Sequence, residues 1–182
     1  MTTPSPNIHP DLTLEEIQSL LPGARRALFR HYHLGGCSSC AFSPKETLAQ
    51  LAARSNVDPA QMMAHLLAAD QADQAILLDP AELQQWRSQN RPHLLCDIRS
   101  REEFEAVHIP GAQFLTQDLV QALMAGDKTL PIVFCDHRGQ HALDTAAFFQ
   151  GHGFTSIRVL RGGIDAWAEQ IDPQLPRYHL ER

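Results

Sequence analysis

The hydrophobic pattern of this chain changes once, near residues 69–75. Before that point apolar side chains recur every three or four residues, as they do on one face of a helix. After it, short apolar runs that suit buried parallel strands alternate with helical segments. The change predicts two domains, a small all-helical domain over 11–70 and an α/β domain over 74–180, with residues 1–10 as a disordered lead-in.

Start and stop signals in the first half predict four short helices. Thr13 and Glu16 have the spacing of a capping box, in which the Thr hydroxyl accepts from the third amide and the Glu carboxylate reaches back. Pro22 ends the first helix, and Pro44 and Pro59 stand where a first helical turn tolerates proline. The expected helices span 14–21, 24–34, 46–57 and 60–70.

Strands and helices alternate through the second half, which is typical of an α/β domain with a mostly parallel sheet. The expected strands are 76–78, 93–98, 113–115, 131–135 and 157–160. The expected helices are 80–89, 101–107, 118–126, 142–154 and 164–171. Ligands of open α/β sheets bind beyond the carboxyl ends of the strands, so we look for functional residues there.

Composition excludes several classes of protein. The chain has 182 residues and a net charge of −6, which gives no support for a nucleic-acid surface built from clustered Lys and Arg. No apolar run approaches the length of a membrane span, and the polar, proline-rich N-terminus is unlike a signal peptide. The 4 cysteines are too few and too unevenly spaced for a disulfide framework. We therefore expect a cytoplasmic protein with free thiols and no nucleic-acid or membrane partner.

Cys135 ends the apolar run PIVFC, and polar residues separate it from the next expected helix. A loop that enters a helix N-terminus presents free amides and the positive end of the helix dipole. Both favour an anion, so we expect the Cys135 thiolate to form readily, with His137 and Arg138 adding to this effect and Asp136 opposing it. The alternative is a strand-end cysteine that packs as a small hydrophobic side chain.

Three segments resemble the rhodanese-type sulfurtransferases. They are CDIRSREEFEAVHIPGAQF over 96–114, PIVFCDHRGQHALDTAAFFQGHGF over 131–154 and VLRGGIDAW over 159–167. The resemblance implies a rhodanese-like, mostly parallel sheet flanked by helices. It also implies that Cys135 takes up sulfane sulfur as a persulfide and passes it to a thiol or to cyanide, a reaction that requires no cofactor.

The same resemblance assigns roles to the neighbouring residues. It implies a substrate-binding loop around Cys135, made of Asp136, His137, Arg138, Gly139, Gln140 and His141. It implies that Asp97 and Arg99 form a supporting ion pair. The partners it implies are a small sulfur donor and a thiol acceptor, including a protein of sulfur or iron–sulfur metabolism.

The Cys135 loop departs from the family pattern. Arg138 stands where the family commonly has glycine, and the glycine follows as Gly139, which leaves the use of thiosulfate as the donor open. A related fold that removes phosphate places Arg six residues after its cysteine. His141 occupies that place, which argues against a phosphatase.

Cys37 and Cys40 form a CxxC pair between two expected helices. The segment resembles small helical CxxC domains that are fused to redox and iron–sulfur proteins. Three interpretations stay open: a sulfur-relay or redox pair, a ligand pair for zinc or an iron–sulfur cluster, and inert thiols. A four-thiolate site would require a homodimer. The rival to an enzyme is a non-catalytic rhodanese-fold binding module whose CxxC domain holds a metal or cluster for cluster assembly or redox sensing.

Overall fold

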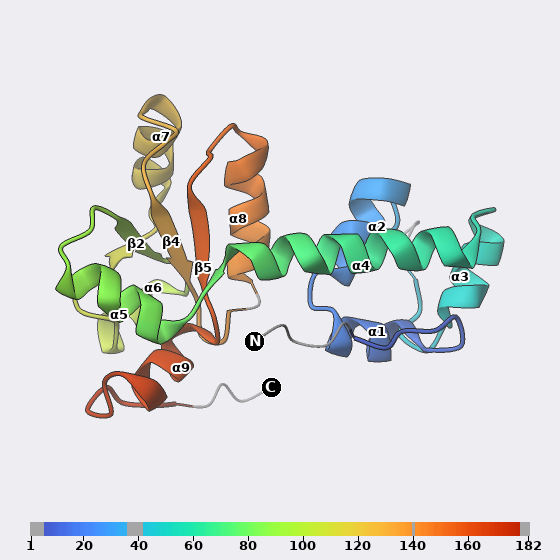
Figure 1. Ribbon diagram of the computed structural model, residues 1–182, viewed down its shortest axis with the longest axis horizontal. Helices are drawn as coiled ribbons and strands as arrows, with labels where there is room; N and C mark the ends of the chain where they lie inside the picture. Colours follow the sequence, from blue (N-terminus) through green and yellow to red (C-terminus); the bar gives the residue numbers. More distant parts are fainter. Residues whose placement is uncertain (1–5, 36–41, 140, 179–182) are drawn as a thin grey trace. The chain divides into compact units, whose positions relative to one another are not determined.

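The computed structural model describes residues 6–35, 42–139 and 141–178. The chain divides into two compact units, Met1–Ala75 and Ile76–Arg182 (Figure 1). Among the described residues, no helix combines the length and the apolar character that crossing a membrane requires. Each unit has a hydrophobic core of its own.

The first unit is helical in its described part. Its helices are α1 Leu14–Leu20, α2 Ala24–Tyr32, α3 Leu48–Arg54 and α4 Pro59–Ile76. The capping box of Thr13 and Glu16 is confirmed, since the Glu16 carboxylate accepts from the Thr13 amide at 2.8 Å and the Thr13 hydroxyl accepts from the Glu16 amide. The core of this unit is apolar and gathers side chains from all four helices.

Several helix boundaries in the first unit differ from the sequence prediction: α2 ends at Tyr32 and not at residue 34, and α3 ends at Arg54 and not at residue 57. Helix α3 begins at Leu48, because Thr47 and Gln50 form a second capping box that fixes the first turn there. Helix α4 runs to Ile76 and so passes through 69–75, where we expected the pattern to change. This stretch is rich in Ala and Gln and contains no Gly or Pro, so nothing in it stops a helix.

The second unit is a parallel sheet of five strands in the order β1-β5-β4-β2-β3, which confirms the predicted α/β class. The strands are β1 Leu77–Leu78, β2 Leu94–Asp97, β3 Gln113–Phe114, β4 Ile132–Cys135 and β5 Ile157–Leu160. The helices are α5 Pro80–Ser88, α6 Arg101–Ala106, α7 Gln117–Ala125, α8 Ala142–Gly151 and α9 Gly163–Gln170.

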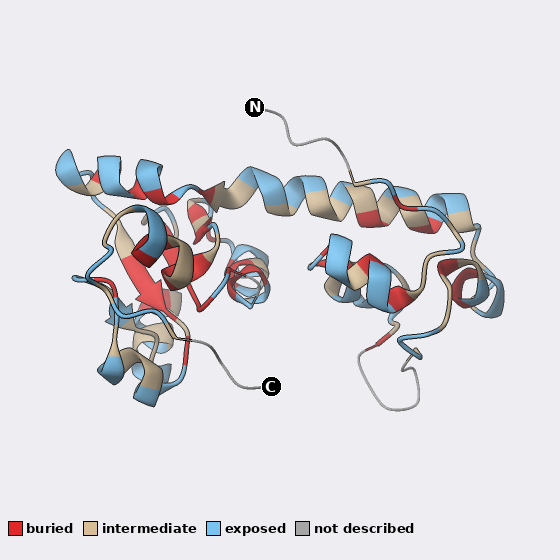
Figure 2. Ribbon diagram, turned by 90° about the horizontal axis from the view of Figure 1, so that it is seen from below, coloured by how far each residue is buried: buried red, intermediate tan, exposed pale blue. Residues whose placement is uncertain are grey.

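Side chains of the central strand β4 alternate between two cores, one on each face of the sheet. Ile132 and Phe134 pack with side chains of α7 and α8, whereas Val133 and Cys135 pack with side chains of α5 and α9. In Figure 2 the central strands are mostly buried, whereas the helices around them have exposed outer faces. The alternation therefore directs Cys135 toward the layer formed by α5 and α9.

Candidate active site

Cys135 is the last residue of β4 and lies at the carboxyl end of the sheet. Its neighbour in register on β2 is Asp97. The Cys135 side chain is only 1% exposed, and its thiol donates to the Asp136 carbonyl oxygen at 3.4 Å. The cysteine therefore lies at the predicted place in the fold and is closed off from solvent.

Asp136 organises the loop that follows. Its carboxylate accepts hydrogen bonds from the amides of Gly139, His141 and Ala142, the last two at 2.7 and 3.1 Å. These are the loop and first-turn amides that would otherwise face an anion at the helix N-terminus. Asp136 thus places its own carboxylate on the amides of the loop, and its substrate-binding role stays a prediction.

The other predicted loop residues divide by exposure. His137 is buried and Gly139 is buried with φ of 82°, whereas Arg138 and His141 are exposed. Gln140 lies outside the described residues. Of these side chains, the guanidinium of Arg138 is the cation available at the surface of the loop.

The thiolate expected from the sequence is not favoured in this conformation. Burial is the main cause that raises the pKa of Cys135 well above its usual range, and the carboxylates of Asp97 and Asp136 raise it further. The charge of Arg99 and the amide of Ile164 act in the opposite direction without overcoming burial. The prediction of a readily formed thiolate is therefore wrong for this conformation. Desolvation raises the pKa of Cys135 most, and the amides of the loop already donate to the Asp136 carboxylate.

The first turn of α9 donates two backbone hydrogen bonds to the Cys135 loop. The Ile164 amide donates to the Asp136 carbonyl oxygen at 2.9 Å, and the Asp165 amide donates to that of His137 at 3.1 Å. This close approach depends on Gly163, which has φ of 60°. A Cβ atom at Gly163 would lie 2.6 Å from the carbonyl carbon of His137.

Gly163→Ala is expected to destabilise the second unit more than Gly153→Ala. Both glycines have positive φ, so both changes carry the left-handed backbone cost of about 1–2 kcal/mol. Nothing lies within 4 Å of a Cβ atom at Gly153, whereas at Gly163 the loop must move, which adds about 1–3 kcal/mol. Urea unfolding of the two variants measures the difference, and equal midpoints would contradict the packing described here.

Asp97 and Arg99 form the predicted ion pair, and both side chains are nearly inaccessible, at 1% and 2% exposed. The Arg99 Nη2 atom donates to Asp97 at 2.6 Å and to the Val107 carbonyl oxygen at 2.7 Å, while Nη1 donates to the Tyr178 hydroxyl at 2.7 Å. Burial alone lowers the pKa of Arg99, but the hydrogen bonds to Asp97 and Tyr178 outweigh it and raise that pKa. The pair therefore ties β2 to the segment after α6 and to the C-terminal residues.

Cys96 is the second buried thiol of this unit. Its side chain is 0% exposed and belongs to the core on the α7 and α8 face, opposite to Cys135. Burial, with a smaller effect of the Asp97 carboxylate, raises the pKa of Cys96 to about 12. Cys96 is therefore part of the buried packing of this core.

The free energy of unfolding is expected to fall above about pH 9, where free thiols ionise. The raised pKa of Cys96 means that the folded chain keeps a proton that the unfolded chain has lost, so the contribution to stability is complete below about pH 9 and disappears as the pH approaches 12. Urea unfolding between pH 7 and the alkaline range measures the slope. Cys96→Ala is expected to reduce the slope and to leave the part that the raised pKa of Cys135 contributes, and an unchanged slope would contradict the assignment.

Sequence reasoning missed the residues that cover the Cys135 loop. Tyr178 stacks on His137 with ring centroids 4.4 Å apart, and its hydroxyl donates to the Glu103 carboxylate at 2.7 Å. Arg177 forms an ion pair with Asp165 at 2.7 Å. The available signal was a proline-rich stretch with basic and aromatic residues, DPQLPRY, that continues past the last helix.

Cys37 and Cys40 lie outside the described residues, so their metal or redox role stays a prediction. In the described part of this unit, the rings of His31 and His65 stack 4.3 Å apart, and the Tyr32 hydroxyl lies 2.7 Å from His65 Nδ1. Across the described residues, no three side chains of the metal-binding types converge on one point.

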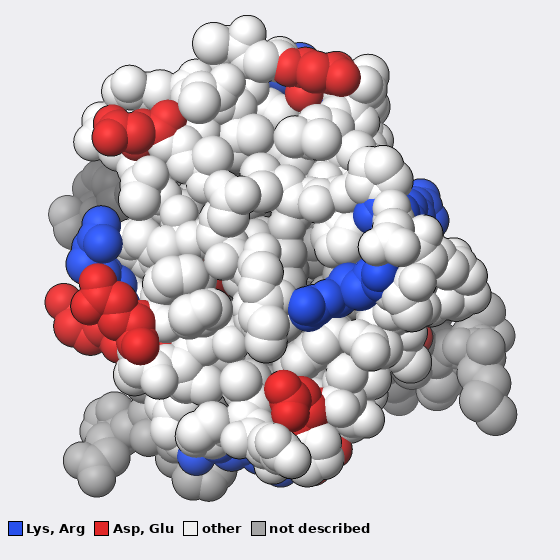
Figure 3. All heavy atoms as spheres, turned by 90° about the vertical axis from the view of Figure 1, so that its left-hand side faces the viewer, with Lys and Arg blue, Asp and Glu red and all other residues white. Residues whose placement is uncertain are grey.

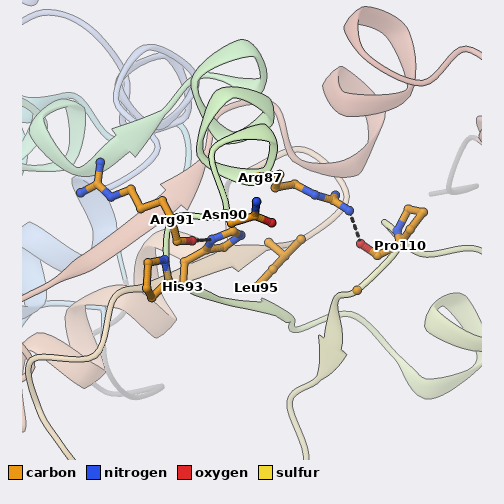
Figure 4. Close-up of a pocket in the computed structure, with 8 residues that line it drawn as sticks. Arg87, Asn90, Arg91, His93, Leu95 and Pro110 are labelled. Atoms are coloured by element: carbon orange, nitrogen blue, oxygen red, sulfur yellow. Dashed lines mark hydrogen bonds between the residues drawn. The ribbon is translucent and has the colours of Figure 1, made fainter.

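A separate pocket of about 350 Å³ lies beside the end of α5 and the start of β2, and no residue of the Cys135 loop lines it (Figure 4). Arg87 reaches across it to the Pro110 carbonyl oxygen at 2.6 Å, next to Asn90 and His93.

On the face drawn in Figure 3, Lys and Arg side chains do not gather into a basic patch.

Comparison with known proteins assigns the second unit to a family. The sequence model of the rhodanese-like domain matches residues 79–170. "Probable adenylyltransferase/sulfurtransferase MoeZ" of Mycobacterium tuberculosis is 32% identical over 115 residues, which cover 60% of this chain and 29% of that protein. "Adenylyltransferase and sulfurtransferase MOCS3" of Drosophila grimshawi is 38% identical over 100 residues, or 50% of this chain and 22% of that protein.

The chain therefore spans less than a third of the length of these curated relatives. Among solved structures, a rhodanese-like domain protein from Staphylococcus aureus is 20% identical with a TM-score of 0.46, and the match covers 57% of this chain and 98% of that chain.

Proposed function

This chain belongs to the rhodanese-like domain family through residues 79–170, and from that premise we propose that it is a sulfurtransferase in which Cys135 carries the transferred sulfur. The observation that carries the proposal is the position of Cys135. It ends the central strand of the sheet, and its loop is held between the first turns of α8 and α9. Relatives whose names include sulfurtransferase support the same chemistry.

The proposed reaction has two displacement steps. In the first, the Cys135 thiolate, having released its proton, attacks the outer sulfur of the donor and the donor's sulfur–sulfur bond breaks. A persulfide donor leaves as a thiolate, and thiosulfate would leave as sulfite. In the second step an acceptor nucleophile attacks the outer sulfur of the Cys135 persulfide, and the Cys135 thiolate is released. No electrons are gained from outside, so no cofactor is required.

Residues near Cys135 supply charge for these steps. Arg99 and the Ile164 amide both favour the negatively charged form of the sulfur. Arg138, exposed on the loop, is suited to attract an anionic donor. Asp136 shapes the loop and does not bind the donor in this scheme, because its carboxylate is occupied by three amides.

We propose a persulfide as the donor in preference to thiosulfate, and a thiol, free or on a protein of sulfur metabolism, as the acceptor. The reason is that thiosulfate carries a second anionic group, while the amides of Gly139, His141 and Ala142 that would receive it already bind Asp136. A relative named as a sulfurtransferase supports transfer of sulfur to such an acceptor.

Single-turnover transfer to cyanide tests the proposed function. The protein is mixed with glutathione persulfide or with thiosulfate, and thiocyanate is then measured after donor removal and cyanide addition. We expect one equivalent of thiocyanate after the persulfide and much less after thiosulfate. Thiocyanate from neither donor would overturn the proposal.

A non-catalytic binding module is the second candidate, and the observation that favours it is the burial and raised pKa of Cys135. In this reading the rhodanese fold is a docking surface. If the domain is only a binding module, Cys135 is expected to acquire no sulfur from any donor. The turnover measurement therefore separates the two candidates.

For Cys37 and Cys40 we propose participation in the same thiol chemistry, either by accepting sulfur from Cys135 or by holding zinc or an iron–sulfur cluster. Metal analysis and the visible absorbance of anaerobically purified protein test the second form. A site with two ligands from each chain would also require a homodimer, which sedimentation measures. If the protein is a monomer without metal, the sulfur-relay role remains. It is tested by measuring sulfur transfer from Cys135 in the Cys37→Ser and Cys40→Ser variants.

A further inference from the structure

The last described residues, 172–178, run over the Cys135 loop and are here called the strap. Tyr178 anchors its end in three ways. The ring stacks on His137 at an interplanar angle of 20°. The hydroxyl accepts from Arg99 at 2.7 Å and donates to Glu103 at 2.7 Å. Tyr178 therefore joins the loop, the buried ion pair and helix α6.

Arg177 anchors the strap to α9. Its Nε and Nη2 atoms donate to the Asp165 carboxylate at 2.7 and 3.0 Å, and Nη1 donates to Glu169 at 3.2 Å. Pro176 precedes both anchors and lines a small enclosed space together with Ile164 and Ala168. The enclosed space leaves no volume that a water molecule can enter.

This closure conflicts with a reaction at Cys135. A donor must bring its outer sulfur into bonding contact with the thiol, and the product adds one sulfur atom to the side chain. With 1% exposure, Cys135 offers neither access nor space. Some part of the cover has to move. The start of the strap is fixed by the Asp172 amide, which donates to the Trp167 carbonyl oxygen, and by Leu175, which packs against the core, whereas Arg177 and Tyr178 are held through their side chains.

We propose that the strap is a lid over Cys135 and that the surface beneath it is the docking site of the sulfur acceptor. The inference rests on the proposed function of Cys135. The lid opens transiently in the free protein, which admits a small donor, and an incoming acceptor segment then replaces the strap on the same groups. The anchors favour such exchange, because the ion pairs of Arg177 are partly exposed and contribute little individually.

The surface beneath the strap indicates the chemistry of its partner. It combines an apolar floor of Ile164 and Ala168 with the carboxylates of Asp165 and Glu169 and the ring of His137. An extended peptide segment with a basic residue next to an aromatic one satisfies all three features. The strap itself has this character in the sequence PRY over 176–178. The acceptor is therefore a protein segment of similar composition, delivering its thiol to Cys135.

Alkylation of Cys135 by iodoacetamide, followed peptide by peptide in a mass spectrometer, tests the lid. Tyr178→Ala and a chain ending at Leu175 are expected to raise the alkylation rate of Cys135 by at least about tenfold, because the closed state is no longer favoured. Tyr178→Phe keeps the ring and loses the hydroxyl bonds, so its rate is expected to be intermediate.

Cys96 provides the internal control in the same samples, since it is buried under α7 and α8 and is exposed only by general unfolding. Its alkylation rate is expected to stay unchanged. Arg101→Ala, which removes an exposed ion pair on α6, is the matched surface variant and is expected to behave as wild type. No increase at Cys135, or an equal increase at Cys96, would overturn the lid.

The peptide PRY, which the chain ending at Leu175 lacks, tests the docking site when it is added to that chain. We expect it to slow alkylation of Cys135 again in a saturable manner, and the same peptide with Gln in place of its Arg to protect less. Rapid alkylation at every peptide concentration would overturn the docking site. Alkylation does not involve sulfur transfer, so a lid that opens in a protein without transfer activity would contradict the proposed function and leave the lid intact.

Discussion

Cys135→Ser is expected to reduce sulfur transfer to the background rate, while Cys96→Ala retains it. Serine keeps the size of the side chain but forms no persulfide, so the first step has no nucleophile. The expected loss is at least about a thousandfold, the size seen when a nucleophile is removed from an enzyme. Single-turnover thiocyanate formation from a persulfide donor measures it.

Cys96 is the appropriate control because it is buried in the same sheet, on the strand next to β4, with its side chain in the opposite core. A general effect of losing a buried thiol would appear in both variants. Equal activity of Cys135→Ser and wild type would remove Cys135 from the reaction. Equal loss in both variants would attribute the effect to folding and not to chemistry.

Asp97→Ala is expected to lower the free energy of unfolding by about 3–5 kcal/mol, because it leaves the buried Arg99 charge without its partner. The Arg99 guanidinium would keep its bonds to Val107 and Tyr178, which are neutral groups and do not balance its charge. Urea unfolding at neutral pH measures the change.

Glu105→Ala is the matched control, since it removes one partner of an ion pair between side chains that are 62% and 65% exposed. Exposed pairs contribute little, so this variant is expected to unfold with wild type. An Asp97→Ala variant as stable as Glu105→Ala would show that the buried pair does not hold the end of β2.

The fold of the second unit follows from local patterns. The apolar runs that precede Cys96 and Cys135 are short and rich in branched side chains, and each becomes a central parallel strand. Because a parallel sheet brings the carboxyl ends of its strands to one edge, the position of Cys135 beside Asp97 was also accessible from the sequence. The ends of helices were harder to predict from the sequence where several residues could serve as the N-cap, as at Thr47.

The burial of Cys135 and the raised pKa of its thiol could not be predicted from the sequence. The sequence places polar residues after the cysteine, but it does not say whether their amides face an anion or a neighbouring side chain. The backbone turn at Gly139 brings Asp136 onto those amides, and burial then raises the pKa of the thiol. Both effects depend on three-dimensional closure of the loop.

The strap was missed for a related reason. Residues 172–178 have neither helical nor strand periodicity, so no pattern assigns them a position. Their contacts reach Glu103, more than seventy residues away in the sequence, through one tyrosine hydroxyl. Long-range side-chain contacts of this kind are decided by the tertiary structure alone.

The intact mass of the protein after incubation with a persulfide donor shows directly whether Cys135 carries sulfur. We expect a gain of one sulfur atom that maps to the peptide containing Cys135, is absent from Cys135→Ser and disappears when cyanide is added. A protein that gains no sulfur at Cys135, either as wild type or in the chain ending at Leu175, would contradict the assignment of Cys135 as the sulfur carrier.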